Sequence, residues 1–141
     1  MEDRVKEAIF RQVGREPFGK KFGLTLVDLE EGHSKVTMIF TPDMENIFGM
    51  AHGGAVFALI DEAFQTACNT YGTVALALNV NITYIASPAA GNKLTAVAKE
   101  FSRTSKTANY DIKVNDEQGN LIASCQALAY RQGKPLPFLE S

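Results

Sequence analysis

The chain has 141 residues, of which 45% are hydrophobic and 21% are charged, and its formal net charge is -2. This length suits one domain with a single core, spanning residues 1–141, and the composition excludes a mainly disordered chain. A net charge so near zero provides no overall basic field, so we expect neither nucleic acid nor a membrane as a partner.

The cysteine and histidine positions do not indicate a metal site. Cys68 and Cys125 form no C-x-x-C pair, and neither His33 nor His52 is spaced with them as a zinc ligand would be. We expect two buried free thiols, no metal and no cofactor. The charged N-terminus lacks a signal-peptide core and no apolar run is long enough to span a membrane, so we expect a cytoplasmic protein.

A short amphipathic helix is predicted over residues 2–13, because Val5, Ala8 and Ile9 recur at helical spacing among charged side chains. Three residues that disfavour helix are expected to end it: Gly14, Pro17 and Gly19. Two strands are predicted next, over residues 22–28 and 34–40, joined by a turn at residues 30–33.

The following segment is predicted to be a long helix from Gly53 or Gly54 to Tyr71, because it lacks proline and is rich in alanine. It is apolar on nearly every face, which is typical of a helix surrounded by protein. Four more strands are predicted over residues 74–85, 93–102, 107–115 and 121–130. The tail after Arg131 contains two prolines and is expected to be loosely ordered.

This order of elements predicts an α+β fold in which one long helix covers an antiparallel sheet. The expected core extends over residues 22–131. A single helix leaves part of such a sheet uncovered, and a dimer is a simple way to cover it.

The residues with the clearest chemical potential lie between Asn46 and Asp61. His52-Gly53-Gly54 opens the long helix, where backbone N–H groups without intrahelical partners suit an oxygen that develops negative charge. A glycine-rich turn capped by a histidine is the simpler interpretation of this motif. Asn46 and His52 add polar side chains just upstream.

Asp61 lies in the middle of the apolar helix, on a stripe whose members are mostly apolar or small. A buried carboxylate must be paired, neutralised or functional, because its isolated burial costs several kcal/mol. The neighbouring Glu62 points about 100° away and is expected to be paired or to lie at the helix edge.

Helix geometry separates Gly53 from Asp61. Eight residues at about 1.5 Å each place them roughly 12 Å apart along one helix, whereas reacting atoms must approach within about 3.5 Å. If both groups act on one substrate, they must come from two copies of the chain.

The stretch from Asn46 to Asn69 resembles the PaaI-type hotdog thioesterases of phenylacetate degradation. The family pattern has an Asn, a Gly three residues later, His-Gly-Gly, and an Asp nine residues after the His. These features fall on Asn46, Gly49, His52-Gly53-Gly54 and Asp61. The segments Asn81–Gly91 and Ser105–Thr107 also match, and the resemblance extends over about Phe22 to Tyr130.

The resemblance implies a hotdog fold, a helix wrapped by a curved antiparallel sheet, and a homodimer that often pairs into a homotetramer. It implies hydrolysis of an acyl-coenzyme A thioester, with Asp61 as general base or nucleophile and the Gly53 N–H polarising the carbonyl. His52 and Asn46 would orient substrate or water. An aryl or hydroxyphenylacetyl group is one candidate acyl chain; Phe48, Phe57, Phe64 and Tyr84 suit it, although core packing explains such residues equally well.

The expected substrate-binding residues are Gly54, Phe57, Gln65, Asn79, Arg103, Ser105 and Lys106. The last three lie just after the predicted 93–102 strand and are candidates to bind the phosphates of the nucleotide. Ordinary loop charges explain Arg103 and Lys106 equally well. One position departs from the family, because some relatives place a Ser or Thr where this chain has Ala77. Two alternatives stay open: a non-catalytic acyl-CoA-binding protein, and a dehydratase or hydratase on the same fold. The sequence lacks the His-Phe-Pro-Gly type motif of the acyl-carrier-protein dehydratases.

Overall fold

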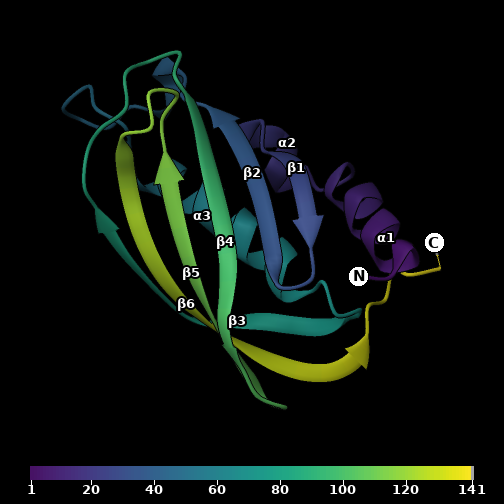
Figure 1. Cartoon of the computed structure of the whole chain (residues 1–141). Coiled ribbons are helices and arrows are strands. Elements are labelled where there is room, and N and C mark those ends of the chain that lie inside the picture. The colour runs from purple at the N-terminus through teal and green to yellow at the C-terminus, as the bar shows by residue number, and fades with distance from the viewer. Residues whose placement is uncertain (141) are drawn as a thin grey trace.

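The computed structural model describes residues 1–140 and consists of a curved six-stranded antiparallel sheet wrapped around one long helix. The helices are α1 (Asp3–Val13), α2 (Pro17–Phe22) and α3 (Gly53–Cys68), with a 3-10 turn η1 (Pro42–Met44). The strands are β1 (Thr25–Glu30), β2 (His33–Ile39), β3 (Thr73–Tyr84), β4 (Lys93–Arg103), β5 (Thr107–Asn115) and β6 (Leu121–Pro135). Figure 1 shows the sheet curving around α3, with α1 and α2 beside β1.

The strand order in the sheet is β1-β2-β4-β5-β6-β3, and every neighbouring pair is antiparallel. The predicted α+β fold is confirmed. The chain inserts α3 between β2 and β3, so β3 enters the sheet at the far edge from β1. Consequently β3 pairs only with β6 among the described strands and leaves one of its edges open.

The core is formed by alternate side chains of the sheet packed against α3. Helix α3 buries residues on nearly every side, including Leu59, Ile60, Ala63 and Phe64, as its apolar composition predicts. Phe64 packs against Tyr110 of β5 with ring centroids 5.6 Å apart. Helix α3 is therefore held in place mainly by apolar packing against the sheet.

The region before β1 differs from the prediction. Residues 17–22 form α2 instead of the first part of a strand, and β1 begins only at Thr25. Pro17 occupies the start of α2, where its missing N–H has no intrahelical partner to lose, and Gly23 ends the helix with a φ of 65°. Pro17 and Gly19 therefore belong to a second helix rather than to a linker.

The ends of two other elements also differ from the prediction. Helix α3 ends at Cys68 rather than Tyr71, because the Asn69 side chain caps it and bonds Ala75 of β3. The tail after Arg131 is ordered, since β6 continues to Pro135 and Leu136 is buried. Its end meets the N-terminal helix, where Arg4 and Glu140 form an ion pair at 3.1 Å.

The two cysteines are buried and free, as predicted. Within residues 1–140, no helix combines the length and the apolar character needed to cross a membrane.

Candidate active site at the start and middle of α3

The loop that precedes α3 is organised by Asn46. Its Oδ1 accepts hydrogen bonds from the backbone N–H groups of Phe48 at 2.9 Å and Met50 at 3.1 Å, and its own N–H donates to the Met50 carbonyl at 2.7 Å. Gly49 reverses the chain between them with a φ of 71°. The side-chain oxygen of Asn46 therefore fixes the shape of the loop, while the side-chain NH₂ group of Asn46 has no acceptor among residues 1–140.

The first turn of α3 presents a free backbone donor. His52 is the N-cap: its Nδ1 accepts from the Gly54 N–H at 2.8 Å, and its own N–H donates to the Met44 carbonyl at 2.8 Å. The Gly53 N–H meets no acceptor in the described part of the chain and lies at the positive end of a 16-residue helix. Such a donor suits an oxygen that gains negative charge during a reaction.

Tyr84, at the end of β3, packs directly against Gly53. Its hydroxyl donates to the Gly53 carbonyl at 3.1 Å, and a Cβ at position 53 would lie 3.2 Å from the Tyr84 Cζ. The glycine therefore allows the ring to approach the helix start. Sequence reasoning considered Tyr84 only as a possible contact for an acyl chain, since nothing in the local pattern links it to a residue 31 positions earlier.

Asp61 lies in the middle of α3, is half-buried, and lines a cavity of about 460 Å³. The cavity walls come from α1 and the loop after it, from α3, from the start of β3, and from residues 136–138. Its polar lining includes Arg15, Glu16 and Gln65. No Lys, Arg or His nitrogen of the described residues lies within ion-pairing distance of the Asp61 carboxylate.

The environment of Asp61 disfavours its charged form. Burial raises the pKa of the Asp61 carboxyl above its ordinary value, and the nearby negative charge of Glu16 raises that pKa further. A carboxylate that lacks a cationic partner and faces a cavity has the character of a catalytic base rather than of a structural ion pair.

Glu62 is more deeply buried than Asp61, with only 4% of its surface exposed. It is paired rather than at the helix edge: its Oε1 accepts a hydrogen bond from Gln65 Nε2 at 2.7 Å, and it faces Glu16 from the α1–α2 connection. The sequence pattern assigned the most apolar surroundings to Asp61 rather than to Glu62. Helical spacing alone cannot show that the α1–α2 connection folds over Glu62.

The other predicted binding residues on α3 and β3 are accessible. Gly54 and Phe57 are exposed on the first turns of α3, and the exposed Gln65 lines the cavity one turn after Asp61. Asn79 is exposed on β3, and Ala77 of the same strand lines the cavity without a hydroxyl group. Phe64, by contrast, is 1% exposed and belongs to the core.

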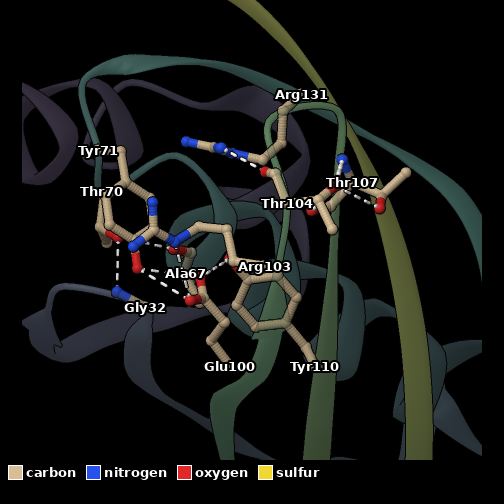
Figure 2. A network of polar contacts seen from close by, with 10 residues as sticks. All are labelled: Gly32, Ala67, Thr70, Tyr71, Glu100, Arg103, Thr104, Thr107, Tyr110 and Arg131. Atoms are coloured by element: carbon tan, nitrogen blue, oxygen red, sulfur yellow. Dashed lines mark hydrogen bonds and ion pairs between the residues drawn. The ribbon is translucent and has the colours of Figure 1, made fainter.

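The three residues predicted to meet phosphates lie far from Gly53 within one copy of the chain. Arg103 bonds Glu100 through Nε at 3.1 Å, and its guanidinium lies 4.1 Å from the ring centre of Tyr71, just beyond the C-terminal end of α3 (Figure 2). Ser105 and Lys106 are exposed in the turn between β4 and β5. A 16-residue helix thus separates this group from the Gly53 N–H.

Among residues 1–140, no group of three or more His, Cys, Asp or Glu side chains could hold a metal ion.

Comparisons with known proteins identify relatives of this chain in sequence and in fold. The family model of the thioesterase superfamily matches residues 48–123. The acyl-coenzyme A thioesterase PaaI of Escherichia coli is 34% identical over 81% of this chain and 81% of its own length. The structure of E. coli PaaI, described as from the phenylacetic acid degradation operon, superposes with a TM-score of 0.89 at 30% identity, covering 94% of this chain and 96% of that one.

Two further solved structures are similar. A mutant of the phenylacetic acid degradation protein PaaI from Thermus thermophilus has a TM-score of 0.79 at 34% identity, covering 82% of this chain and 99% of that chain. A Streptococcus mutans protein bound to acetyl-CoA has a TM-score of 0.76 at 26% identity, covering 80% of this chain and 91% of that chain.

Proposed function

Because this chain belongs to the thioesterase superfamily, as a hotdog-fold thioester hydrolase of the PaaI type, we propose that it hydrolyses an acyl-coenzyme A thioester with Asp61 as the catalytic carboxylate. The observation that carries this proposal is that α3 presents two polar groups without a hydrogen-bond or ion-pair partner among residues 1–140. One is the free Gly53 N–H at the helix start, and the other is the carboxylate of Asp61 in the cavity wall.

The proposed reaction uses these groups in sequence. Asp61 takes a proton from a water molecule as the water oxygen bonds to the thioester carbonyl carbon. The Gly53 N–H holds the carbonyl oxygen while it carries negative charge. The carbonyl then re-forms as the carbon–sulfur bond breaks, Asp61 passes its proton to the leaving thiolate of coenzyme A, and the free acid leaves.

Asn46 and His52 have supporting roles in this proposal. The Asn46 Oδ1 and the His52 Nδ1 are already occupied by backbone N–H groups, so both side chains fix the path of the chain into α3. The Asn46 NH₂ group remains available to orient the substrate or the water. Ala77 offers no hydroxyl to hold that water, so Asp61 and polar neighbours in the cavity such as Gln65 would have to hold it.

The working unit is proposed to be at least a dimer. Gly53 and Asp61 stand eight residues apart on one helix, roughly 12 Å along its axis, so one thioester cannot reach both in a single copy. The open edge of β3 supports assembly with a second copy, because it exposes Leu76, Leu78 and Tyr84. Pairing at this edge would extend the sheet and satisfy its free backbone groups.

Arg103, Ser105 and Lys106 are not near Gly53 within one copy of the chain. Their proposed role in binding the phosphates of coenzyme A therefore requires that a second copy bring them to the acyl site. The first acyl group to test is arylacetyl, because the PaaI relatives are named for phenylacetic acid degradation.

The decisive experiment measures thiol release from a series of aryl, short, medium and long acyl-CoAs by the wild type and by Asp61→Asn. Asn keeps the shape of the side chain and removes its basicity, so we expect turnover to fall by about 10²-fold or more. Sedimentation of both proteins checks that assembly persists. Wild-type turnover in Asp61→Asn would refute the proposal, and tight binding without thiol release would favour a binding protein.

A further inference from the structure

A pair of glutamates beside Asp61, the buried Glu62 and the half-buried Glu16, has no role in the reaction described above. Glu62 projects from α3, and Glu16 comes from the connection between α1 and α2, 46 residues earlier in the chain. The two carboxyl groups meet over Gly19 of α2: a Cβ added there would lie 2.8 Å from Glu16 Oε1 and 3.1 Å from Glu62 Oε2. Gly19 is itself buried, so the pair is enclosed from this side.

One side chain already serves the other two oxygens. Gln65 Nε2 donates to Glu16 Oε2 and to Glu62 Oε1, both at 2.7 Å. The remaining oxygens, Glu16 Oε1 and Glu62 Oε2, are buried and have no hydrogen-bond donor within the described chain. Two such acceptors facing each other in a site shielded from water are not compatible with two negative charges.

We propose that Glu16 and Glu62 form a carboxylic acid–carboxylate pair that shares one proton and, through Gln65, holds the α1–α2 segment over Asp61 as a positioning element of the hydrolytic site. A single proton between the two facing oxygens satisfies both of them. It also reduces the charge of the pair from -2 to -1.

The titratable groups around the pair are consistent with a shared proton. Asp61 is the neighbouring carboxyl on α3, and Arg15 lies beside Glu16 in the cavity lining, while Lys20 and Lys21 are exposed on α2. None of the ion pairs formed by residues 1–140 includes Glu16 or Glu62. Burial, the hydrogen bond to Glu16 and the charge of Glu16 raise the pKa of Glu62 to about 9.

The connection to Asp61 is direct. Gln65 lies one turn after Asp61 on the same face of α3, and both residues line the cavity together with Glu16. The α1–α2 connection therefore forms one wall of the space in which the substrate would meet Asp61. Loss of the shared proton would set two adjacent carboxylates against each other and release that wall.

The test has an infrared arm and a kinetic arm. The infrared arm records the C=O stretch of a protonated carboxyl group at about neutral pH in the wild type, in Glu62→Gln and in Glu7→Gln, a control that alters an exposed glutamate of α1. We expect the band in the wild type and in Glu7→Gln, and its loss in Glu62→Gln. Absence of the band from the wild type at about pH 7 would overturn the proposal.

The kinetic arm measures kcat/KM for one acyl-CoA from about pH 6 to 10, with enzyme-free hydrolysis subtracted. In the wild type we expect kcat/KM to fall above about pH 9, by about tenfold per pH unit. Glu62→Gln should lack this decline, because its amide donates permanently to Glu16. Gly19→Ala, which displaces the pair without altering a charge, should lower kcat/KM about tenfold at neutral pH.

This arm rests on the proposed role of Asp61, whereas the infrared arm does not. A wild type without thiol release refutes the hydrolytic function alone, since the band still reports the shared proton. An unchanged alkaline decline in Glu62→Gln, or wild-type kinetics in Gly19→Ala, refutes the positioning role.

Discussion

Replacement of Gly53 by alanine tests whether the approach of Tyr84 sets the geometry of the helix start. The added Cβ would lie 3.2 Å from Tyr84 Cζ, 3.4 Å from its hydroxyl oxygen and 3.5 Å from Cε1. The ring must therefore move by a few tenths of an ångström. Tyr84 is 52% exposed, so it can move outward, but its hydrogen bond to the Gly53 carbonyl is then strained or lost.

The structure predicts a small effect on stability and a large effect on activity. Loss of the Tyr84 hydrogen bond costs about 0.5–1.5 kcal/mol, and alanine recovers about 0.4–1 kcal/mol because it restricts the unfolded chain. The two terms nearly cancel, and Tm should change by less than about 4 °C. A shift of the Gly53 N–H away from the carbonyl oxygen should lower kcat by about 10²-fold.

The assay is a double-mutant cycle that combines Gly53→Ala with Tyr84→Ala, read by thiol release from an acyl-CoA and by thermal unfolding. If the steric contact with Tyr84 is the cause, the double variant should be more active than the product of the two single effects predicts. Strictly multiplicative effects, or wild-type kcat in Gly53→Ala, would refute the reasoning.

Three further changes test other parts of the structure. Between about pH 5 and 9 the folded chain keeps on Glu62 a proton that the unfolded chain releases, so wild-type stability should fall with rising pH by up to about 1.4 kcal/mol per unit. Urea unfolding at a series of pH values should show that the stability of Glu62→Gln falls less per pH unit than that of the wild type. An equal fall in both proteins would contradict the raised pKa. Tyr110→Phe removes a buried hydroxyl that donates to Glu100 at 3.0 Å and should cost about 1–2 kcal/mol, seen as a lower urea midpoint with an unchanged m-value. Leu78→Arg places a charge on the exposed part of β3 and should yield monomers in sedimentation velocity; intact assemblies would show that β3 is not the contact.

The elements with strong local signals could be predicted from the sequence. The apolar composition of the segment that begins at Gly53 indicated a helix enclosed by protein, and the strand predicted over residues 107–115 coincides with β5. The short helix α2 was missed because Pro17 and Gly19 were interpreted as residues that end a helix. Proline at the first helical position begins one, and Gly19 is required by its contact with Glu16 rather than by a turn.

In the candidate site, too, residues with local signals could be predicted, whereas contacts between distant segments could not. His52, Gly53 and Asp61 could be selected because the start of a helix and a carboxylate in an apolar stripe are visible in a short window of sequence. The contact of Glu16 with Glu62 joins segments 46 residues apart, and that of Tyr84 with Gly53 joins segments 31 residues apart. No periodicity encodes such contacts, so the surroundings of Glu62 depend on where the α1–α2 connection folds.

The cavity beside Asp61 is built from two kinds of structure. Its floor consists of α3 and the start of β3, whose side chains also form the core of the molecule. Its remaining walls come from α1, the α1–α2 connection and residues 136–138. Substitutions in the floor, or at Ile9 and Leu136 of the walls, disturb packing, because these residues belong to the core. Substitutions at the exposed wall residues Gln12, Arg15 and Pro17 can reshape the cavity at little cost to the core. If Asp61 acts as proposed, changes at these exposed positions would alter which acyl groups fit the cavity while the packing of α3 stays intact.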